Sequence, residues 1–230
     1  MKSREDLKNE SRAFLARNPF IQKMFLLYTI ITVVQILFQN YGNNNLFYYS
    51  FETANISANF SIVNSGVTFF VGLLQASLML KIYDVLKRGF DSDNPENNMS
   101  FSELITESLY LLKKEYFLPV LIVSILSGLL VFIGFLFFII PGIILTYAVS
   151  QAVLITKDNI DLESNSSFTE PISQSIDLMK GHKMDLFILQ FSFIGWYLLV
   201  GLTFGVAGYW VYPDLFTRQV LFYMDIKENK

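Results

Sequence analysis

The sequence contains no cysteine and only one histidine, His182. Disulfides, thiolate chemistry and cysteine-ligated zinc are therefore excluded, and a histidine-based metal site has too few ligands. Charged residues are also scarce: they make up 16% of the 230 residues, and the net charge of −3 offers no broad cationic surface for nucleic acid. We expect no cofactor and no nucleic-acid partner.

Apolar residues dominate the chain instead. Hydrophobic residues make up 53% of it and aromatic residues 16%, and the mean hydropathy is +0.43. A water-soluble domain of this length would struggle to bury so much apolar surface, so the composition predicts the lipid bilayer as a partner. The polar, basic start and the apolar segment 20–38 are similar to a signal peptide. No small-residue cleavage site follows, and we interpret this segment as an uncleaved first spanning helix.

Long uncharged runs predict the number of membrane crossings. A helix crosses a hydrocarbon core of about 30 Å with roughly 20 residues. The runs at 20–39, 53–80, 117–156 and 186–213 predict five crossings, since the 40 uncharged residues of the third run suffice for two. Pro141 and Gly142 predict a tight turn between those two. Residues 214–224, which include Arg218, would form a shorter sixth crossing.

The basic residues predict the orientation. Lys and Arg cluster before the first predicted span, between the second and third, between the fourth and fifth, and at the C-terminus, whereas the loops at 40–57, 141–142 and 209–213 contain neither. Cytoplasmic loops retain positive charge during insertion. We expect an all-α polytopic bundle of about six spans in the cytoplasmic membrane, with both termini cytoplasmic. Arg218 is the exception, expected near the outer interface and paired with Asp214.

A recurring pattern precedes each predicted hairpin of apolar helices. It consists of a Ser, an acid three residues later, a second Ser eight residues later, and Leu or Met twelve residues later. The matched positions are Ser3, Asp6, Ser11 and Leu15; Ser100, Glu103, Ser108 and Leu112; and Ser167, Glu170, Ser175 and Met179. The second and third copies also predict capping boxes, Ser100 with Glu103 and Ser167 with Glu170.

These segments indicate amphipathic helices that lie in the membrane interface. Within a single membrane domain, residues 1–230, we interpret them as the start of three repeat units, 1–90, 99–157 and 166–225, each an interfacial helix followed by a hairpin. The polar stretches 91–98 and 158–167 would be linkers between units. Chance similarity among amphipathic helices is the alternative.

Several runs in the C-terminal half carry a family resemblance. They are Ile-Pro-Gly-Ile at 140–143, Met-Lys-Gly-His-Lys at 179–183, Ser-Phe-Ile-Gly-Trp at 192–196, Leu-Thr at 202–203 with its following glycines, the 210–213 stretch and Phe-Tyr at 222–223. In these runs the chain resembles a bacterial integral-membrane family known as domain of unknown function 975. Met184 and Asp214 depart from the family pattern. The resemblance covers roughly the last 120 residues and implies a location and a fold, because the family has no established activity.

Two groups of residues are candidate sites. Lys180, Gly181, His182 and Lys183 join an interfacial helix to a spanning one, where they could contact lipid headgroups or a partner. The alternative, which the pattern favours, is a bend at Gly181 with lysines at the membrane boundary. The second group places small residues at spacings near four and predicts close helix packing, with a substrate path as the alternative. It comprises Gly195, Trp196, Gly201, Gly205 and Gly208.

The apolar runs carry few groups that could perform chemistry. The five clear spans contain no Asp, Glu, His or Arg away from their ends, although transporters and intramembrane enzymes generally place such groups at depth. Paired carboxylates, catalytic triads and phosphate loops are also missing. We therefore expect a protein that is not an enzyme and acts through lipid or through other membrane proteins, including a second copy of itself. The alternative is a small transporter or permease subunit.

Overall fold

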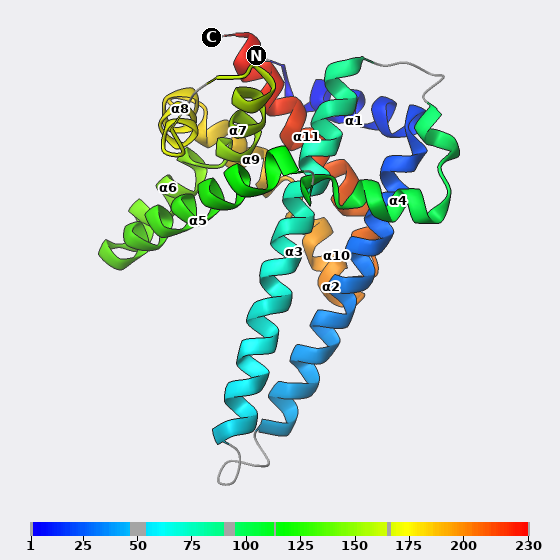
Figure 1. Cartoon of the computed structure of the whole chain (residues 1–230), viewed down its shortest axis with the longest axis vertical. Helices are drawn as coiled ribbons and strands as arrows, with labels where there is room; N and C mark the ends of the chain where they lie inside the picture. Colours follow the sequence, from blue (N-terminus) through cyan, green and yellow to red (C-terminus); the bar gives the residue numbers. More distant parts are fainter. Residues whose placement is uncertain (1, 47–53, 90–94, 113, 165–166, 230) are drawn as a thin grey trace.

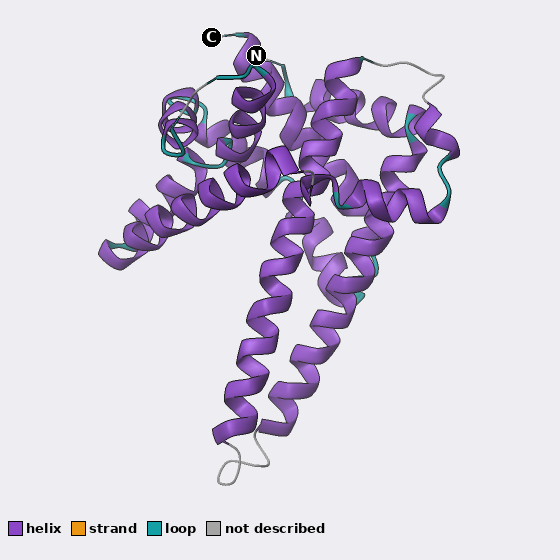
Figure 2. Ribbon diagram, viewed as in Figure 1, coloured by secondary structure: helices purple, strands orange, loops and turns teal. Residues whose placement is uncertain are grey.

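The computed structural model describes residues 2–46, 54–89, 95–112, 114–164 and 167–229, and every regular element in these ranges is helical (Figures 1 and 2). This agrees with the all-α prediction. The helices are α1 (Arg4–Arg17), α2 (Pro19–Leu46), α3 (Ala54–Arg88), η1 (Pro95–Asn98), α4 (Phe101–Ser108), η2 (Tyr110–Leu112), α5 (Lys114–Phe137), α6 (Ile139–Ala148), α7 (Ala152–Asp161), α8 (Glu170–Leu178), α9 (Lys183–Phe191), α10 (Ile194–Leu202) and α11 (Gly208–Glu228).

The first hairpin consists of α2 and α3, which lie side by side and project from the rest of the molecule (Figure 1). Both contain segments long and apolar enough to cross a membrane, Pro19–Leu37 and Asn64–Arg88. The start of α2 and the end of α3 contribute to the main core, with Phe25 and Leu80 fully buried. Part of the predicted loop 40–57 is helical, because α2 continues to Leu46 and α3 begins at Ala54; residues 47–53 lie outside the described residues.

The second hairpin pairs α5 with α6, and α7 continues α6 after a short break (Figure 1). The chain reverses at Phe138, which is extended, three residues before the predicted turn at Pro141. Pro141 lies instead in the first turn of α6, where helical backbone amides have no partner and proline is tolerated. Gly142 faces the ring of Phe135, and a Cβ there would lie 2.4 Å from Cγ of that ring. Gly142 is therefore needed for close helix approach.

The third hairpin differs from the prediction. The run 186–213 is not one helix, because α9 and α10 are bent by 42° relative to each other and α10 ends at Leu202. The backbone reverses at 203–207 and α11 then begins at Gly208. The prediction that 209–213 forms a loop is therefore wrong: these residues form the first turns of α11.

The described helices provide four segments long and apolar enough to cross a membrane, or up to five if the bent pair forms one span. Helix α11 is not among them, so the expected short sixth span has no support. Its charged residues explain this, since they include Asp214, Arg218, Asp225 and Lys227. Helix α11 packs against α1, α2 and α3, and much of its surface lies in the main core.

A short helix precedes each hairpin: α1 before α2, α4 before α5, and α8 before α9. The capping box of Ser100 and Glu103 is confirmed, and Ser3 forms an equivalent box with Asp6. The box predicted at Ser167 is wrong. Thr169 is the N-cap residue of α8, no side chain caps this helix, and the Ser167 hydroxyl lies beside that of Thr169.

The predicted linkers are shorter than expected. Helix α7 continues through Asp158 to Asp161, so these residues do not belong to the 158–167 linker. Within the 91–98 stretch, residues 95–98 form η1, and residues 91–94 lie outside the described residues. The N- and C-terminal ends lie close together (Figure 1), and the backbone amide of Lys2 donates a 2.8 Å hydrogen bond to Asp225.

Candidate functional site

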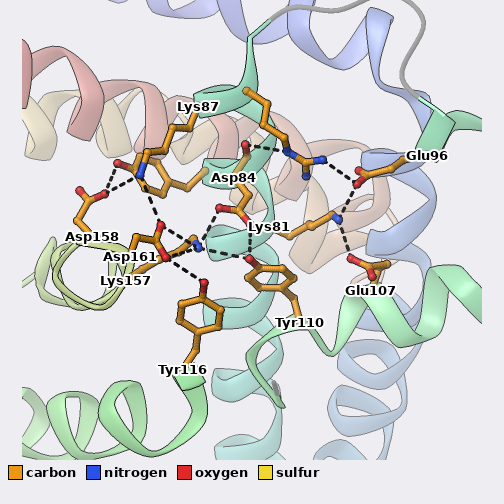
Figure 3. A network of polar contacts seen from close by, with 12 residues as sticks. Lys81, Asp84, Lys87, Glu96, Glu107, Tyr110, Tyr116, Lys157, Asp158 and Asp161 are labelled. Atoms are coloured by element: carbon orange, nitrogen blue, oxygen red, sulfur yellow. Dashed lines mark hydrogen bonds and ion pairs between the residues drawn. The ribbon is translucent and has the colours of Figure 1, made fainter. Parts of the chain in front are cut away.

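Charged and tyrosine side chains gather where the ends of α3, α7 and α11 meet α4 and η2 (Figure 3). We call this group the charged cluster. Five of its residues are no more than 4% exposed, namely Lys81, Tyr83, Lys157, Asp158 and Tyr223. The cluster comprises Lys81, Tyr83, Asp84, Lys87, Arg88, Glu96, Glu107, Tyr110, Tyr116, Lys157, Asp158, Asp161, Tyr223 and Lys227.

Asp158 of α7 accepts hydrogen bonds from the two other hairpins. The hydroxyl of Tyr83 in α3 donates to one carboxylate oxygen at 2.6 Å, and the hydroxyl of Tyr223 in α11 donates to the other at 2.6 Å. The ammonium groups of Lys227 and Lys87 also pair with this carboxylate, the latter at 3.6 Å. Asp158 therefore joins the ends of α3, α7 and α11.

Lys157 supplies the positive charge next to Asp158. Its ammonium group lies 2.9 Å from Asp84 in α3 and 3.3 Å from Asp161 one turn further along α7. It also lies 4.3 Å from the centre of the Tyr116 ring, a cation–π geometry. A lysine that is 1% exposed is stable in its charged form only when paired in this way.

A second arm of the cluster joins α3 to the segment that leads into α5. Lys81 lies 3.0 Å from Glu96 of η1 and 2.6 Å from Glu107 of α4, and Arg88 also reaches Glu96, at 3.2 Å. Lys81 also lies 5.6 Å from the centre of the Tyr110 ring, and the Tyr110 hydroxyl donates to Asp84, the partner of Lys157. The arm lets one continuous network hold parts of all three hairpins.

The charges in the cluster balance: five cations face five carboxylates. Burial raises the pKa of Tyr110 and Tyr223 well above the usual phenol value, and a hydrogen bond to Asp84 or Asp158 raises each further. Both phenols therefore remain neutral donors at physiological pH. A neutral network of satisfied pairs leaves no excess charge to bind an ion, and its geometry suits a structural joint.

A second, smaller polar group joins α11 to α1. Arg218 forms a two-point ion pair with Asp214, one turn earlier in α11, with one hydrogen bond of 2.9 Å. The hydroxyl of Ser11 in α1 donates to Asp214 at 2.7 Å. The predicted pairing is thus confirmed. The expected place of Arg218 near the outer interface stays a prediction; in the structure its helix, α11, packs along α1.

The comparisons bear on the C-terminal part of the chain, which contains α7 and α11. Residues 131–230 match the model of a family described as Protein of unknown function (DUF975). The resemblance to DUF975 is confirmed over these residues. The match begins within α5 and includes Lys157, Asp158, Tyr223 and Lys227 of the charged cluster, whereas the α3 partners lie outside it. Comparisons with curated proteins and with solved structures gave no match.

Within the DUF975 region, Lys180–Lys183 forms the turn between α8 and α9. Gly181 has φ +86, a left-handed conformation that glycine adopts readily, so it provides the bend. Lys180 is exposed and pairs with Asp177 at 2.7 Å, and His182 lies 3.4 Å from Asp185. Lys183 begins α9. The structure brings these residues together at the surface, and contact with lipid or a partner stays a prediction.

Among the glycines of the predicted packing group, Gly205 is the one that lies close to another described helix. A Cβ at Gly205 would lie 3.2 Å from Val33 of α2, so this glycine does allow close approach. No atom lies within 4 Å of such a Cβ at Gly195 or Gly201, and the neighbour of Gly208 is Tyr212 of its own helix. Trp196 is 51% exposed. The reversal at 203–207 separates Gly195 and Gly201 of α10 from Gly208 of α11, so these positions do not share one helix face.

Several polar residues within the apolar helices have hydrogen-bond partners close by, although the buried hydroxyls of Thr29 and Ser127 have none in the described structure. The Tyr147 hydroxyl donates to Gln190 at 3.1 Å, which joins α6 to α9. Ser150 and Ser192 donate to carbonyl groups of their own segments instead. Among the described residues, no three His, Asp or Glu side chains are grouped so that they could hold a metal ion.

The charged cluster itself was missed from the sequence. Its lysines were interpreted only as markers of the cytoplasmic side, because each stands at the end of an apolar run. One local signal was available: Lys157 and Asp161 are four residues apart on one helix face, a spacing that permits pairing. The partners in α3 and α11 are 65 to 75 residues away in sequence, and no local pattern links them.

Proposed function

We propose that the chain is a multi-pass protein of the bacterial cytoplasmic membrane, with both termini and the charged cluster at the cytoplasmic face. The separation of the exposed apolar side chains from the ion pairs supports this location. Large apolar side chains of α2, α5, α6 and α10 are exposed, including Phe132, Phe137 and Leu198, whereas the ion pairs gather at the other end of these helices. An aqueous environment would not stabilise such apolar surfaces, and lipid would.

We further propose that the molecule is built from three units, each a short amphipathic helix followed by a hairpin. The second Ser of each matched pattern supports this: Ser11, Ser108 and Ser175 are all buried. Each donates to another unit's hairpin, to Asp214 of α11, to the Met24 carbonyl of α2, and to the Ala148 carbonyl of α6. Helices α1, α4 and α8 accordingly pack on α11, α2 and α7.

The role we propose is non-catalytic: the protein acts through lipid contact or association with another membrane protein. The single observation that supports this is the charge-balanced cluster, whose ionisable groups pair with one another. The groups that remain for contact with other molecules are apolar faces and surface cations.

A small transporter or permease subunit is the alternative. The bonds between polar side chains of neighbouring helices argue against a polar path: Tyr147 donates to Gln190, Gln35 to Thr68, and Gln39 to Asn64. Side chains that satisfy one another hold helices together and offer less to a passing solute.

Reconstitution separates these two roles. The purified protein would be placed in vesicles loaded with pH-sensitive and potassium-sensitive dyes, with protein-free vesicles as the control. We expect retention of the protein in the membrane after alkaline carbonate extraction, and leak rates for both ions equal to the control. Protein-dependent, saturable flux would contradict a role through lipid or protein contact and favour the transporter, and release by carbonate would contradict the membrane location.

A further inference from the structure

A groove of about 320 Å³ lies where α1 meets α10 and α11. Phe193 and Val211 are buried in it, at 2% and 5% exposure, while Trp196 and Trp210 remain 51% and 61% exposed. Its volume falls in the lower part of the range of about 300–1,000 Å³ that is typical of pockets for small ligands. The groove therefore has a buried apolar floor and two solvent-accessible indole rings at its surface.

Polar contacts of Arg218 and Asp214 hold the residues that form the floor of the groove. The guanidinium group of Arg218 lies 4.6 Å from the centre of the Phe193 ring, and Arg218 is itself held by Asp214. Asp214 in turn accepts from Ser11 of α1. These contacts hold α1, α11 and the α9–α10 break together around the groove, so its shape does not depend on a ligand. They also neutralise Asp214, the carboxylate that lines it.

The remaining charge at the groove is positive. Arg12 of α1 lines it and is exposed. Arg4 and Lys8 precede Arg12 at four-residue spacing, so the three cations follow one flank of α1. Within the described parts of the chain, no ion pair engages any of these three side chains. The groove is therefore lined by one cation without an ion pair, Arg12, and by the indole rings of Trp196 and Trp210, and two further cations lie along the same helix.

We infer that this groove binds one anionic phospholipid, with the headgroup phosphate at Arg12 and the start of the acyl chains between Trp196 and Trp210. Cations at the level of the headgroups and tryptophans just below them are the arrangement that the membrane boundary favours. The hollow distinguishes this position from the general lipid-facing surface, because a lipid seated there would contact α1, α10 and α11 together. The inference rests on the proposed membrane location.

The chain contains only two Trp residues, and both line the groove, so intrinsic fluorescence reports on this place alone. The protein would be reconstituted in phosphatidylcholine bilayers that contain either acyl-brominated phosphatidylglycerol or acyl-brominated phosphatidylcholine as the quencher. A juxtamembrane cation contributes a preference of about fivefold for an anionic lipid. We expect brominated phosphatidylglycerol to quench half of the accessible fluorescence at about a fivefold lower mole fraction than its phosphatidylcholine counterpart.

Variants assign the preference to the groove. Arg12→Gln should remove it, and Arg12→Lys should retain most of it. Lys23→Gln is the matched control, because it also removes one exposed cation but one that does not line the groove, and it should leave the preference unchanged. Equal quenching by both lipids in the wild type, or a preference that survives Arg12→Gln, would overturn the inference while leaving the membrane location intact. Absence of quenching by either lipid would overturn both.

Discussion

The charged cluster and the α5–α6 hairpin join helices by opposite means. In the cluster, buried side chains such as Lys157 and Asp158 pair across α3, α7 and α11 (Figure 3). In the hairpin no charge is involved: Gly134 and Gly142 let the two helices approach so closely that a Cβ at Gly134 would lie 3.1 Å from the Gly142 Cα. The charged cluster is stable only when every charged partner is present, whereas the α5–α6 contact is possible only because its two glycines lack a side chain.

The largest effect should follow from breaking the cluster. Lys157→Met leaves Asp84 and Asp161 without their closest cation, and the free energy of unfolding should fall by about 3–5 kcal/mol, as when one partner of a buried pair is removed. Denaturant titration in mixed micelles, followed by circular dichroism, measures this change. Lys180→Met is the control and should alter the free energy by less than about 0.5 kcal/mol.

A companion variant sharpens this prediction. Lys157→Met combined with Asp84→Asn removes a cation and an anion together and should recover part of the loss, because less uncompensated charge stays buried. A loss below about 1 kcal/mol in the single variant would mean that the cluster is not the joint between the hairpins.

The α5–α6 hairpin should be destabilised by the addition of a side chain at its glycine contact. Gly142→Val places a Cβ 2.4 Å from the Phe135 ring, and overpacking of this kind costs about 1–3 kcal/mol. The same titration measures the loss. Gly128→Val is the matched control in α5, because no atom lies within 4 Å of its Cβ position. Equal losses in the two variants would show that helix propensity, and not close approach, determines the result.

Apolar runs and helix caps allowed much of the fold to be predicted. The hairpins α2–α3 and α5–α6 lie where long uncharged runs indicated them, and the Ser100 cap begins α4 as expected. The turn was misplaced by three residues because Pro141 is compatible with a first helical turn as well as with a loop. The bend between α9 and α10 was not predicted, because Ser192 and Phe193 carry no local signal for a helix break.

The candidate sites were harder to predict, because most of them depend on contacts between helices that are far apart in the sequence. The turn at Lys180–Lys183 depends on a glycine, and local sequence can indicate it. The cluster depends on pairs between helices, such as Tyr223 with Asp158, and the lipid groove depends on the position of α1 against α11. A single sequence gives the direction of a helix face but not the element that covers it.

Exposed polar contacts should matter less than the buried pairs of the cluster. Ser100→Ala removes the N-cap of α4 and should lower the free energy of unfolding by about 1 kcal/mol. Ser167→Ala, in the corresponding position before α8, should have an effect below about 0.5 kcal/mol, because Ser167 caps no helix. Unfolding of the two variants under identical conditions provides the comparison, and a larger effect of Ser167→Ala would contradict it.

The same cap predicts a pH dependence. Hydrogen bonds from the backbone and side chain of Ser100 lower the pKa of Glu103 in the folded protein. Its contribution to stability is therefore complete at neutral pH and is lost as the pH falls through that lowered pKa. Titration of stability in acid should show this loss in the wild type and a smaller one in Glu103→Gln.

The smallest effect should come from the neutral polar pairs of the first hairpin. Gln35 donates to Thr68 at 2.6 Å, and such bonds between membrane helices contribute about 0.6 kcal/mol on average. Gln35→Leu should lower the free energy of unfolding by that amount in the mixed-micelle titration. A loss as large as that of Lys157→Met would remove the distinction between charged and neutral joints.

Single-cysteine labelling tests the central claim most directly, since the chain has no cysteine of its own. Lys8→Cys, Lys180→Cys and Glu228→Cys mark three segments at the charged end, and Phe138→Cys marks the reversal between α5 and α6. With a membrane-impermeant maleimide, we expect the first three to react only in inverted vesicles and Phe138→Cys only in intact cells. Reaction of any of the first three from the same side as Phe138→Cys would contradict the account.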